Sequence, residues 1–417
     1  MFERPEKGRC AILVHLGLPF VNYESLRELK GLALSAGAQI VEVVTAKRSE
    51  PTPKLFIGEG KAEEIRELIV EHDAGLVIFD HELSPAQERN LERIFACRVL
   101  DRTGLILDIF SRRARTFEGK LQVELAQLEY LSTRLVRGWS HLERQQGGIG
   151  LRGPGETQLE MDRRLIGHRI KVIKDRLAKV RKQRHQGRQG RLKAELMTVC
   201  FVGYTNAGKS TLFNALTQAQ AGVANQLFAT LDPTARSIQL PYGLKVIAVD
   251  TVGFIKNLPH NLVAAFKATL EEATLADLLI HVVDAHHERR DEQRQAVYEV
   301  LQTIGADHVP CLEVFNKVDL LEQEVEHTDY GSEQIPERVW LSARLNSGLE
   351  SLKQAMAQCL VKRFVHCCIC LEPHEGKLLA QLHDNEAILN EYYTDSGHIQ
   401  VELKLPQLTY QQLFERS

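Results

Sequence analysis

Hydrophobic residues follow two patterns along the chain, one typical of strands and one typical of helices. Short apolar runs that predict buried strands occur at residues 10–16, 39–45, 76–79 and 98–101. Stretches with helical spacing lie between them, at residues 23–35, near residues 58–61 and after Ser84-Pro85, a pair typical of a helix cap and first turn. Strands that alternate with helices of this length predict a small parallel α/β sheet.

From about residue 105 to residue 193 the hydrophobic period is helical. Two apolar stripes repeat every three or four residues, namely Leu121, Leu125, Leu128 and Leu135, then Ile166, Ile170, Ile173, Leu177 and Val180. They form the seam of a two-helix coiled coil, and residues 138–155 separate its halves. We therefore expect an antiparallel helical hairpin with a loop at its tip. The stretch HQGRQGR at residues 185–191 is expected to end the second helix and act as a linker.

Length and period together indicate four units, because 417 residues are too many for one typical domain. The last segment predicts a small α+β unit of strand, helix, strand and helix, at residues 364–372, 375–395, 397–405 and 409–417. The expected units are an N-terminal α/β domain, a basic helical hairpin, a larger third domain and this α+β appendage, at residues 1–104, 105–193, 194–363 and 364–417.

Composition narrows the class of protein. With 44% hydrophobic and 26% charged residues the chain is ordinary for a soluble protein, and it lacks the apolar run of about 18 residues that crosses a membrane. Its N-terminus does not have the pattern of a signal peptide. The cysteines sit mostly alone in apolar runs, as buried reduced thiols do, and are Cys10, Cys97, Cys200, Cys311, Cys359, Cys367, Cys368 and Cys370. We expect a cytoplasmic monomer without a membrane partner.

Charge is distributed unevenly along the chain. Residues 111–193 carry 21 Lys and Arg against 8 Asp and Glu, a net charge of +13. Because the whole chain sums to −3, the remaining residues sum to −16. A basic segment joined to acidic ones favours a polyanionic partner that touches only the middle of the chain, and a solvated helix face is the plain alternative.

A phosphate-binding motif follows the strand expected at residues 197–202. The sequence GYTNAGKS at residues 203–210 runs into the helix TLFNALTQ, which is G-x-x-x-x-G-K-S in its strand-loop-helix setting. The glycines let backbone N–H groups surround phosphates, and the helix N-terminus adds a favourable dipole. Lys209 is expected to bridge the β- and γ-phosphates, and the Ser210 hydroxyl to bind Mg²⁺. A chance match is the alternative, and the flanking elements oppose it.

A second motif, DTVG, follows the strand expected at residues 246–249. Asp250 can reach Mg²⁺ through a water, and the Gly253 amide can meet the γ-phosphate and sense its loss. Such a motif alone is common at strand ends, but its distance behind the phosphate loop supports this assignment.

Two further motifs select the base. NKVD at residues 316–319 follows the strand expected at residues 311–315, so the Asp319 carboxylate can accept both N1–H and N2–H of guanine. Adenine lacks these donors and would leave the carboxylate unpaired, at a cost of roughly 1–3 kcal/mol. SAR at residues 342–344 is expected to place the Ala343 amide near guanine O6. Together the four motifs predict an enzyme that binds Mg²⁺ and GTP and hydrolyses GTP to GDP.

These motifs resemble those of the Obg–HflX group of GTPases, and the resemblance extends upstream to the HflX family. FATLDPT at residues 228–234 is similar to switch I of that group, with Thr230 closing on Mg²⁺ when GTP is bound. GGIGLRGPGETQLE at residues 147–160, followed by Asp162-Arg163-Arg164, is similar to the HflX signature, and LFIGEGK at residues 55–61 to its N-terminal domain. The resemblance covers residues 10–360 and implies an α/β chain whose P-loop GTPase domain follows a small parallel α/β domain and a helical hairpin.

The motifs and the resemblance together give the expected site. The GTP contacts are Gly203, Tyr204, Thr205, Asn206, Ala207, Gly208, Lys209, Ser210, Thr211, Phe228, Ala229, Thr230, Leu231, Asp232, Asp250, Thr251, Val252, Gly253, Asn316, Lys317, Asp319, Ser342, Ala343 and Arg344. The Mg²⁺ ligands are Ser210 and Thr230, with Asp250 acting through a water.

No catalytic base is assigned. A Ras-like enzyme orients water with a Gln directly after the D-x-x-G glycine, but here that residue is Phe254, which cannot hydrogen-bond a water. Hydrolysis should therefore be slow alone and should need a group supplied in cis or by a partner. Asn206 occupies the place where several such GTPases bind K⁺, so K⁺ is a candidate cofactor, and a simple turn residue is the equal alternative.

The tip of the hairpin is the expected RNA-binding site. A slim glycine loop can approach an RNA backbone closely while arginines neutralise phosphate, although a solvated connection would have the same composition. The expected contacts are Gly147, Gly148, Gly150, Arg152, Gly153, Gly155, Arg163 and Arg164. By resemblance, HflX proteins bind the large ribosomal subunit and its rRNA, insert this loop near the peptidyl-transferase centre and split stalled ribosomes during stress.

Two other classes of protein are kept as alternatives. The chain could be a GTP-switched RNA-binding or ribosome-assembly module with little hydrolysis of its own, which Phe254 favours. It could also be the GTPase partner of a tRNA-modifying enzyme, but that class has its GTPase domain inserted in a helical domain and a C-terminal cysteine motif, neither of which this layout has.

Two clusters of metal-binding residue types are given ordinary structural roles. HCCIC at residues 366–370 lacks a second pair at zinc-site spacing, and its apolar neighbours predict a buried strand. His286-His287 follows Asp284 at a strand end and predicts a polar loop.

Overall fold

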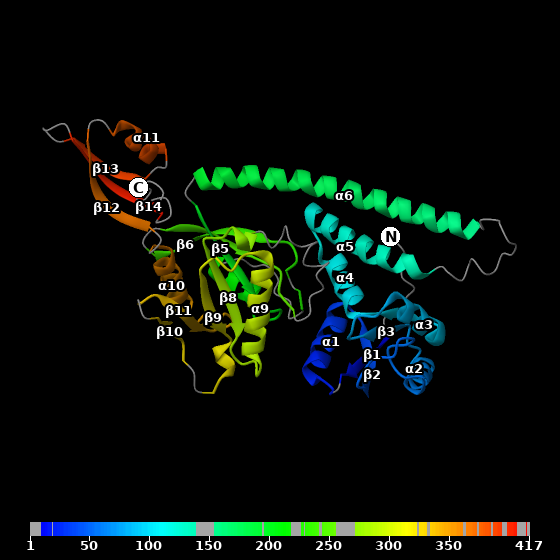
Figure 1. The fold of residues 1–417 in the computed structure, drawn as a ribbon. Coiled ribbons are helices and arrows are strands. Elements are labelled where there is room, and N and C mark those ends of the chain that lie inside the picture. The colour runs from blue at the N-terminus through cyan, green and yellow to red at the C-terminus, as the bar shows by residue number, and fades with distance from the viewer. Residues whose placement is uncertain are drawn as a thin grey trace.

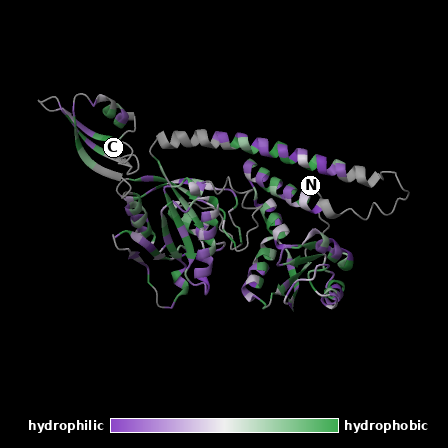
Figure 2. Cartoon of the chain, in the orientation of Figure 1, coloured by the Kyte–Doolittle hydropathy of each residue, from purple (hydrophilic) through white to green (hydrophobic). Residues whose placement is uncertain are grey.

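The computed structural model describes residues 10–18, 20–138, 154–193, 196–217, 227–228, 230–241, 244–255, 272–322, 325–331, 334–361, 364–372, 375–384, 387–393, 398–406 and 414. Figure 1 shows an N-terminal sheet, a long helical hairpin, a central sheet with flanking helices and a small C-terminal sheet. In Figure 2 the central strands of the two larger sheets are hydrophobic and the outer helices carry mixed or polar faces, as a layered α/β protein requires.

The N-terminal sheet confirms the expected parallel α/β architecture. Its strands are β1 (Cys10–Gly17), β2 (Gln39–Lys47), β3 (Leu76–Phe79) and β4 (Arg98–Leu100), in the order β2-β1-β3-β4 with every neighbouring pair parallel. The connecting helices are α1 (Tyr23–Ser35), α2 (Glu59–Glu71) and α3 (Pro85–Phe95). Ser84 caps α3 in a capping box with Gln87, and Pro85 fills the first turn, where its missing N–H has no intrahelical partner to lose.

The helical region is made of α4 (Arg102–Arg113), α5 (Phe117–Gly138) and α6 (Pro154–Lys193). The two apolar stripes meet as expected, because Leu121 and Leu125 of α5 form one buried cluster with Ile173 and Leu177 of α6. Figure 1 shows α5 and α6 running antiparallel. Across the seam Arg169 pairs with Glu124 at 2.7 Å and Lys174 with Glu129 at 2.9 Å.

Two boundaries of the hairpin differ from expectation. The helix α6 continues through residues 185–191, so the prediction that this stretch ends it is wrong. Each glycine costs a helix only about 1 kcal/mol, and the intervening Gln and Arg are good helix formers. Gly155 was expected in the tip loop but lies in the first turn of α6, which opens at Pro154 as N-terminal proline allows.

The C-terminal half of α5 is fixed to the N-terminal domain by a buried polar cluster. Asp101, the N-cap of α4, accepts hydrogen bonds from Tyr130 at 2.7 Å and from Arg134 at 2.6 Å. Arg134 also donates to Glu88 of α3 at 2.6 Å. Because Tyr130 and Arg134 are both on α5, side-chain hydrogen bonds hold the hairpin against the N-terminal domain in addition to the covalent connection.

The central sheet follows strand order β10-β11-β9-β8-β5-β7-β6. Its strands are β5 (Met197–Gly203), β6 (Thr234–Gln239), β7 (Lys245–Asp250), β8 (Leu278–Asp284), β9 (Cys311–Asn316), β10 (His327–Tyr330) and β11 (Pro336–Leu341). Only β6 and β10, at the two edges, pair antiparallel. The helices described here are α7 (Lys209–Thr217), α9 (Arg290–Ile304) and α10 (Leu349–Val361), with a short 3-10 turn at Val318–Leu320. The four expected strands behind the motifs are all present as β5, β7, β9 and β11.

The C-terminal unit differs from expectation in one element. It contains β12 (Phe364–Leu371), α11 (Gly376–Asp384), β13 (Ile388–Tyr393) and β14 (Ile399–Pro406), in the order β12-β14-β13. The helix expected over residues 375–395 is therefore wrong in its second half. Ile388 and the two tyrosines that end β13 favour a pleated surface, and pairing with β14 satisfies the backbone of this segment. The last expected helix lies outside the described residues except for residue 414.

The cysteines are all free thiols, but burial divides them. Cys200 is buried as expected, whereas Cys368 and Cys370 are exposed on one face of β12. The strand at residues 366–370 is thus confirmed, while its burial on both faces is not, because β12 alternates between the small C-terminal core and solvent. In the part of the chain that the structure describes, no helix combines the length and apolar character needed to span a membrane.

One hydrophobic core crosses the boundary between the N-terminal region and the central sheet. Leu29 of α1 and Phe110 of α4 belong to the same buried cluster as Phe228, Val252 and Phe254. The structure therefore brings both regions together through apolar side chains from segments more than a hundred residues apart.

Candidate functional site

The phosphate loop lies where β5 ends and α7 begins. Gly208 has φ +95°, and a Cβ at this position would sit 2.1 Å from Nδ2 of Asn316, so only glycine fits. Lys209 is 6% exposed, and its ammonium donates to the backbone carbonyls of Gly203 at 3.0 Å and Tyr204 at 2.7 Å. The loop thus holds its lysine at the base of the expected phosphate site.

Three expected metal ligands meet at one point. The Ser210 and Thr230 hydroxyls lie 2.7 Å apart, and each donates to Oδ2 of Asp250 at 2.8 Å. These side chains come from α7, from the segment before β6, and from the end of β7. The structure therefore brings together residues that are 20 to 40 positions apart in sequence.

The chemistry of this cluster fits Mg²⁺. All three donors are hard oxygens, which Mg²⁺ prefers. Oδ1 of Asp250 is buried and has no hydrogen-bond partner among the described residues. Burial raises the pKa of Asp250, although Lys209 and the Ser210 and Thr230 hydroxyls act against it. A buried carboxylate with a free oxygen is stabilised when a cation arrives.

Lys209, like Asp250, is a buried charged group that a ligand of opposite charge would stabilise. Burial lowers the pKa of its ammonium to about 8, although the charge of Asp250 acts against this. A phosphate next to this group would favour the protonated form. The site thus contains a cation and an anion that are each incompletely compensated by the protein.

The base-binding end is assembled from the loops after β9 and β11. Asn316 donates through Nδ2 to the Ala207 carbonyl and accepts through Oδ1 from the Ala343 amide, both at 2.9 Å. The Ser342 hydroxyl donates to Asp319 at 2.5 Å. Asn316 therefore joins the phosphate loop to the guanine loop, and Ser342 orients the carboxylate expected to read guanine.

A cavity of about 610 Å³ joins the two ends. Fifteen expected residues line it, together with Leu320: Thr205, Asn206, Gly208, Lys209, Ser210, Thr211, Phe228, Thr230, Thr251, Gly253, Asn316, Lys317, Asp319, Ala343 and Arg344. Gly203, Tyr204, Ala207, Leu231, Asp232, Asp250, Val252 and Ser342 are not part of this lining. Ala229 lies outside the described residues.

Phe254 is turned away from this cavity. Its backbone pairs with the phosphate loop, since Thr205 N–H donates to the Phe254 carbonyl at 2.7 Å and Phe254 N–H donates to the Gly203 carbonyl at 3.0 Å. The ring is 2% exposed and belongs to the core shared with the N-terminal region. The residue after the D-x-x-G glycine therefore has a packing role here.

Asn206 is exposed and has φ +63°, a left-handed conformation that asparagine tolerates better than most residues. This geometry accounts for the residue as a turn former. The K⁺ assignment stays a prediction.

Sequence analysis missed several partners of the site. Lys317 pairs with Asp284 at 2.6 Å, which anchors the guanine loop to the end of β8. His287 and Arg289, in the loop after β8, both approach Glu24 of α1, at 3.6 and 3.2 Å. No local pattern signals such pairs, because each joins segments that only the fold brings together.

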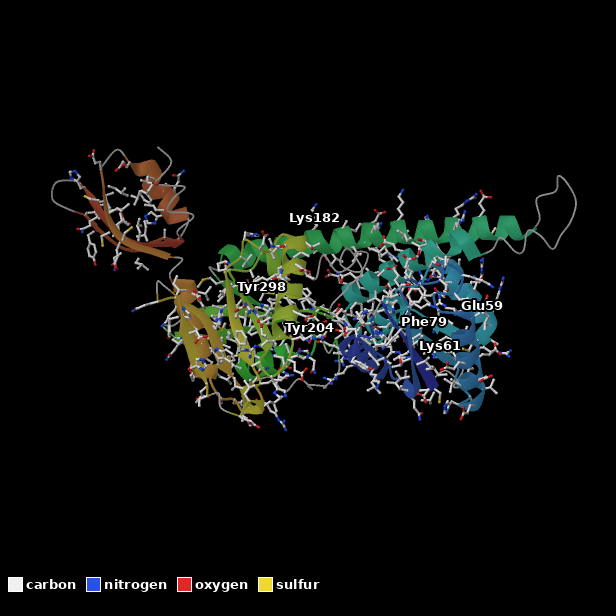
Figure 3. The ribbon with its side chains drawn as sticks, turned by 60° about the horizontal axis from the view of Figure 1, so that its bottom comes forward. Glu59, Lys61, Phe79, Lys182, Tyr204 and Tyr298 are labelled. Atoms are coloured by element: carbon white, nitrogen blue, oxygen red, sulfur yellow. The ribbon has the colours of Figure 1, made fainter. Side chains whose placement is uncertain are left out.

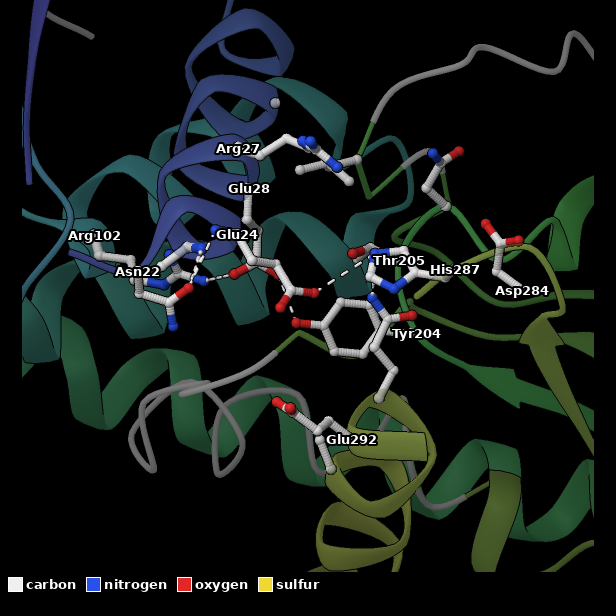
Figure 4. A pocket seen from close by; sticks show the side chains of 16 residues that line it. Asn22, Glu24, Arg27, Glu28, Arg102, Tyr204, Thr205, Asp284, His287 and Glu292 are labelled. Atoms are coloured by element: carbon white, nitrogen blue, oxygen red, sulfur yellow. Dashed lines mark hydrogen bonds and ion pairs between the residues drawn. The ribbon is translucent and has the colours of Figure 1, made fainter. Parts of the chain in front are cut away.

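A second cavity, of about 340 Å³, lies between α1 and the phosphate loop. Figure 4 shows Tyr204 facing Glu28 across it, with a hydrogen bond of 2.5 Å from the Tyr204 hydroxyl. Glu28 also pairs with Arg102, whose guanidinium donates to Asp80 at 2.7 Å. Figure 3 places Tyr204 at the boundary between the two regions. The phosphate loop therefore contacts the N-terminal domain and also lines the nucleotide cavity.

The expected RNA contacts are only partly described. Gly147, Gly148, Gly150, Arg152 and Gly153 lie outside the described residues, Gly155 is in the first turn of α6, and Arg163 and Arg164 are exposed. Figure 3 shows Lys182 further along α6, pointing outward from the helix.

Three family models match consecutive parts of the chain. Residues 23–111 match the N-terminal region of GTP-binding GTPases, and residues 113–191 match their middle region. Residues 198–317 match the model described as a 50S ribosome-binding GTPase.

Curated relatives match over nearly the whole chain. The GTPase HflX of Escherichia coli K12 is 52% identical over 99% of this chain and 97% of its own. The GTPase HflX of Caldanaerobacter subterraneus is 48% identical over 86% of this chain and 82% of its own. Among solved structures, a GTP-binding protein of Sulfolobus solfataricus in complex with GDP is 23% identical, with a TM-score of 0.46, over 84% of this chain and 99% of that chain.

Proposed function

The chain belongs to the HflX family of GTPases and hydrolyses GTP, and from this premise we propose that it is a GTP-controlled factor for the large ribosomal subunit. In this proposal the basic hairpin binds ribosomal RNA and the protein splits or rescues stalled ribosomes during stress. The description of the matched GTPase model, ribosome-binding, supports this partner.

The convergence of Ser210, Thr230 and Asp250 is the observation that carries the GTP-controlled part. Ser210 and Thr230 would hold Mg²⁺ directly and Asp250 through a water, and the ion would neutralise charge between the β- and γ-phosphates. Lys209 would bind the same phosphates, the Gly253 amide would contact the γ-phosphate, and Asp319 would select guanine. Loss of the γ-phosphate would release Thr230 and Gly253.

The exposed cations of α6 support an RNA partner. Arg169 and Lys174 are paired across the seam, but six other exposed cations of this helix have no ion-pair partner among the described residues: Arg163, Arg164, Lys171, Arg176, Lys179 and Lys182. Unpaired cations along one rigid helix suit a phosphate backbone, since each phosphate contact releases a counterion.

The burial of Phe254 favours slow hydrolysis by the chain alone. Its backbone is bound to the phosphate loop and its ring is in the core, so it offers no polar group to a water. A missing group would then come from the ribosome, or hydrolysis would stay slow and GTP binding itself would be the switch.

The test compares GTP turnover of the full chain alone, with small subunits and with large subunits, in K⁺ and in Na⁺. The proposal expects a rise with large subunits only. If large subunits leave turnover unchanged while the chain still binds them with GTP, the binding-switch alternative is supported. If they do not bind, the proposal fails.

Charge reversal separates the hairpin from the rest of the surface. Lys171→Glu, Arg176→Glu and Lys179→Glu together should weaken binding to large subunits by roughly tenfold or more and reduce its salt dependence. The matched control reverses the exposed Lys30, Arg93 and Arg98 of the N-terminal domain. Equal losses in both triple variants would contradict a specific role for α6. A variant with residues 148–155 shortened tests ribosome splitting, and retained splitting would exclude the tip loop from that step.

A further inference from the structure

The segment that carries Thr230 is held by the N-terminal region at several points. Ser35 of α1 accepts a hydrogen bond from the Leu227 amide at 3.0 Å. The Phe228 ring packs edge-on against Phe110 of α4, with centroids 4.7 Å apart. Phe228 adopts this position with φ +56°, an unfavourable conformation for an aromatic residue, so the packing must hold it there.

Asp232 makes three hydrogen bonds from this segment to the N-terminal region. Its Oδ2 accepts hydrogen bonds from the Arg115 amide at 2.7 Å and the Thr116 amide at 2.9 Å, and its Oδ1 accepts from the Thr116 hydroxyl at 2.5 Å. These three donors lie at the junction between α4 and α5. The carboxylate therefore points toward the hairpin and not toward the nucleotide cavity.

Thr116 is at the same time the N-cap of α5. Its hydroxyl oxygen accepts a hydrogen bond from the Gly119 amide at 3.0 Å, the usual capping interaction. Asp232 thus adds a negative charge, from another domain, at the positive end of a helix of 22 residues. The helix that carries this end leads directly to the glycine-rich tip.

Gly119 shows how closely Asp232 approaches α5. A Cβ at position 119 would lie 2.0 Å from Oδ1 of Asp232, closer than any non-bonded atoms can be. Gly119 is inside a helix, where alanine would otherwise be the better residue. The close approach of the carboxylate gives a reason for glycine here.

We propose that Asp232 is a positioning residue for GTP binding, which holds Thr230 over the nucleotide site by fixing the segment to the N-terminus of α5. Two residues span at most about 7 Å, so Thr230 cannot move far while Asp232 stays bound. This inference rests on the proposed role of Thr230 as the residue that closes on Mg²⁺ and GTP.

The contact also links the nucleotide to the hairpin in both directions. GTP favours the closed segment, and the closed segment favours the contact with the N-terminal end of α5. A ligand that binds the hairpin more tightly when this contact is formed therefore raises GTP affinity, and GTP raises the affinity for that ligand by the same factor. A ribosome bound to the hairpin would in this way favour the GTP state without touching the nucleotide.

The test uses the purified full chain without ribosomes. Asp232→Ala and Thr116→Val should each weaken binding of a non-hydrolysable GTP analogue in Mg²⁺ by about tenfold, because a hydrogen bond to a charged group is lost. GDP affinity should change by less than about twofold, since the segment closes only on the γ-phosphate. The Thr116→Ser variant keeps the hydroxyl, so its affinities for GDP and for the GTP analogue should equal those of the unchanged chain.

Gly119→Ala tests the same contact from the other domain. It should weaken the GTP analogue by about as much as Asp232→Ala while adding a better helix former. The double variant should lose no more than either single one, because both remove one contact. Equal losses for GDP and the GTP analogue, or additive losses in the double variant, would overturn the proposal.

Hydrogen exchange supplies a reading that a general loss of stability would not give. The amides of Arg115 and Thr116 should exchange more slowly with the GTP analogue than with GDP, and this difference should vanish in Asp232→Ala. An unchanged difference would contradict the proposal.

A Thr230→Ala variant keeps the two proposals apart. If it does not weaken the GTP analogue selectively, the assigned role of Thr230 fails. If Thr230→Ala weakens the analogue and Asp232→Ala does not, only the positioning role of Asp232 fails.

Discussion

Asp80 and Asp250 occupy equivalent places in the two larger sheets, and their surroundings are opposite. Asp80 follows β3 and Asp250 is the last residue of β7, and each is at most 5% exposed. Asp80 accepts hydrogen bonds from His15 at 2.8 Å, Ser25 at 2.5 Å and Arg102 at 2.7 Å. Asp250 accepts two hydroxyls on one oxygen, and its other oxygen has no partner among the described residues.

Because of these different surroundings, the pKa of one carboxyl group is lowered and the pKa of the other is raised. Burial alone would raise the pKa of Asp80, but the hydrogen bond from His15, the charge of Arg102 and the hydrogen bond from Ser25 hold it below its ordinary value. Burial raises the pKa of Asp250, and its neighbours do not offset this. The ligand site is the edge where charges are left incompletely compensated, and the edge of the N-terminal sheet is closed by its own side chains.

The two buried cations, Arg102 near Asp80 and Lys209 near Asp250, differ in the same way as the two carboxylates. Burial opposes the charge of Arg102, yet Glu28 and Asp80 raise its pKa above the ordinary value. Among the described residues Lys209 has only carbonyl partners within hydrogen-bonding distance, and burial lowers its pKa to about 8. Glu28 pairs with Arg102 and also accepts a hydrogen bond from Tyr204, so this charged cluster contacts the phosphate loop.

The largest effect is expected from removing Asp80. Asp80→Ala should destabilise the N-terminal domain by about 3–5 kcal/mol, because it takes a buried partner from His15 and Arg102. Urea unfolding followed by far-UV circular dichroism measures this. The loss should be complete at neutral pH and should shrink as the pH falls below 4, since a lowered folded-state pKa stabilises only while the carboxylate is ionised. A loss that is the same at pH 7 and pH 3 would contradict the ionic account.

Asp250→Asn should have a smaller and different effect. The folded apoprotein should be as stable as before, or more stable by about 1 kcal/mol at neutral pH, because a raised folded-state pKa means that ionisation opposes folding. Affinity for GTP in Mg²⁺ should fall by roughly 10- to 100-fold. Thermal unfolding and nucleotide titration in Mg²⁺ and in EDTA check both parts. If Asp250→Asn destabilises the apoprotein as much as Asp80→Ala, the contrast between the two sheets is wrong.

Tyr204→Phe tests the link between the two edges. Loss of the hydroxyl that donates to Glu28 should cost about 1 kcal/mol. Tyr298→Phe is the matched control, because that hydroxyl donates to Glu313 at 3.0 Å within the GTPase domain. We expect Tyr204→Phe to increase proteolysis between the domains and Tyr298→Phe to leave it unchanged. Similar proteolysis in both variants would remove the interdomain role of Tyr204.

The smallest effect concerns the proton on Lys209. With a pKa of about 8, the lysine is half neutral at pH 8, so nucleotide binding should take up about half a proton there and about a tenth at pH 7. Calorimetry in two buffers of different ionisation enthalpy measures this uptake. Lys209→Arg should abolish it, because arginine stays protonated. Uptake that persists in this variant would assign the proton to another group.

Much of the fold follows from local patterns. Buried strands such as β1 and β5 are continuous apolar runs, and the seam between α5 and α6 follows from a repeat of three and four residues. Patterns failed where local preference is weak. Residues 388–393 were expected to continue a helix by their spacing and became β13 through pairing with β14. Two glycines in α6 cost too little to end a long helix.

The candidate site divides in the same way. The phosphate loop, Asp250 and Asp319 are recognisable because each motif joins a strand end to a specific chemistry. Thr230 was assigned through the resemblance to switch I of the Obg–HflX group. Asp232 and Tyr204 were expected to contact GTP, and their actual contacts were not recognisable, since their partners Thr116 and Glu28 lie 116 and 176 residues away.

By itself, the sequence determined that this protein is a GTPase, because backbone turns and single side chains that bind phosphate and guanine are encoded within a few consecutive residues. Only the tertiary structure decided how that site is joined to the rest of the molecule. Apolar burial packs distant segments together. This packing places the hydrogen bond between Asp232 and Thr116, the hydrogen bond between Tyr204 and Glu28, and the burial of Phe254 in the shared core. Long-range packing of this kind leaves no local pattern, so the contacts between the candidate GTP site and the N-terminal region could be read only from the fold.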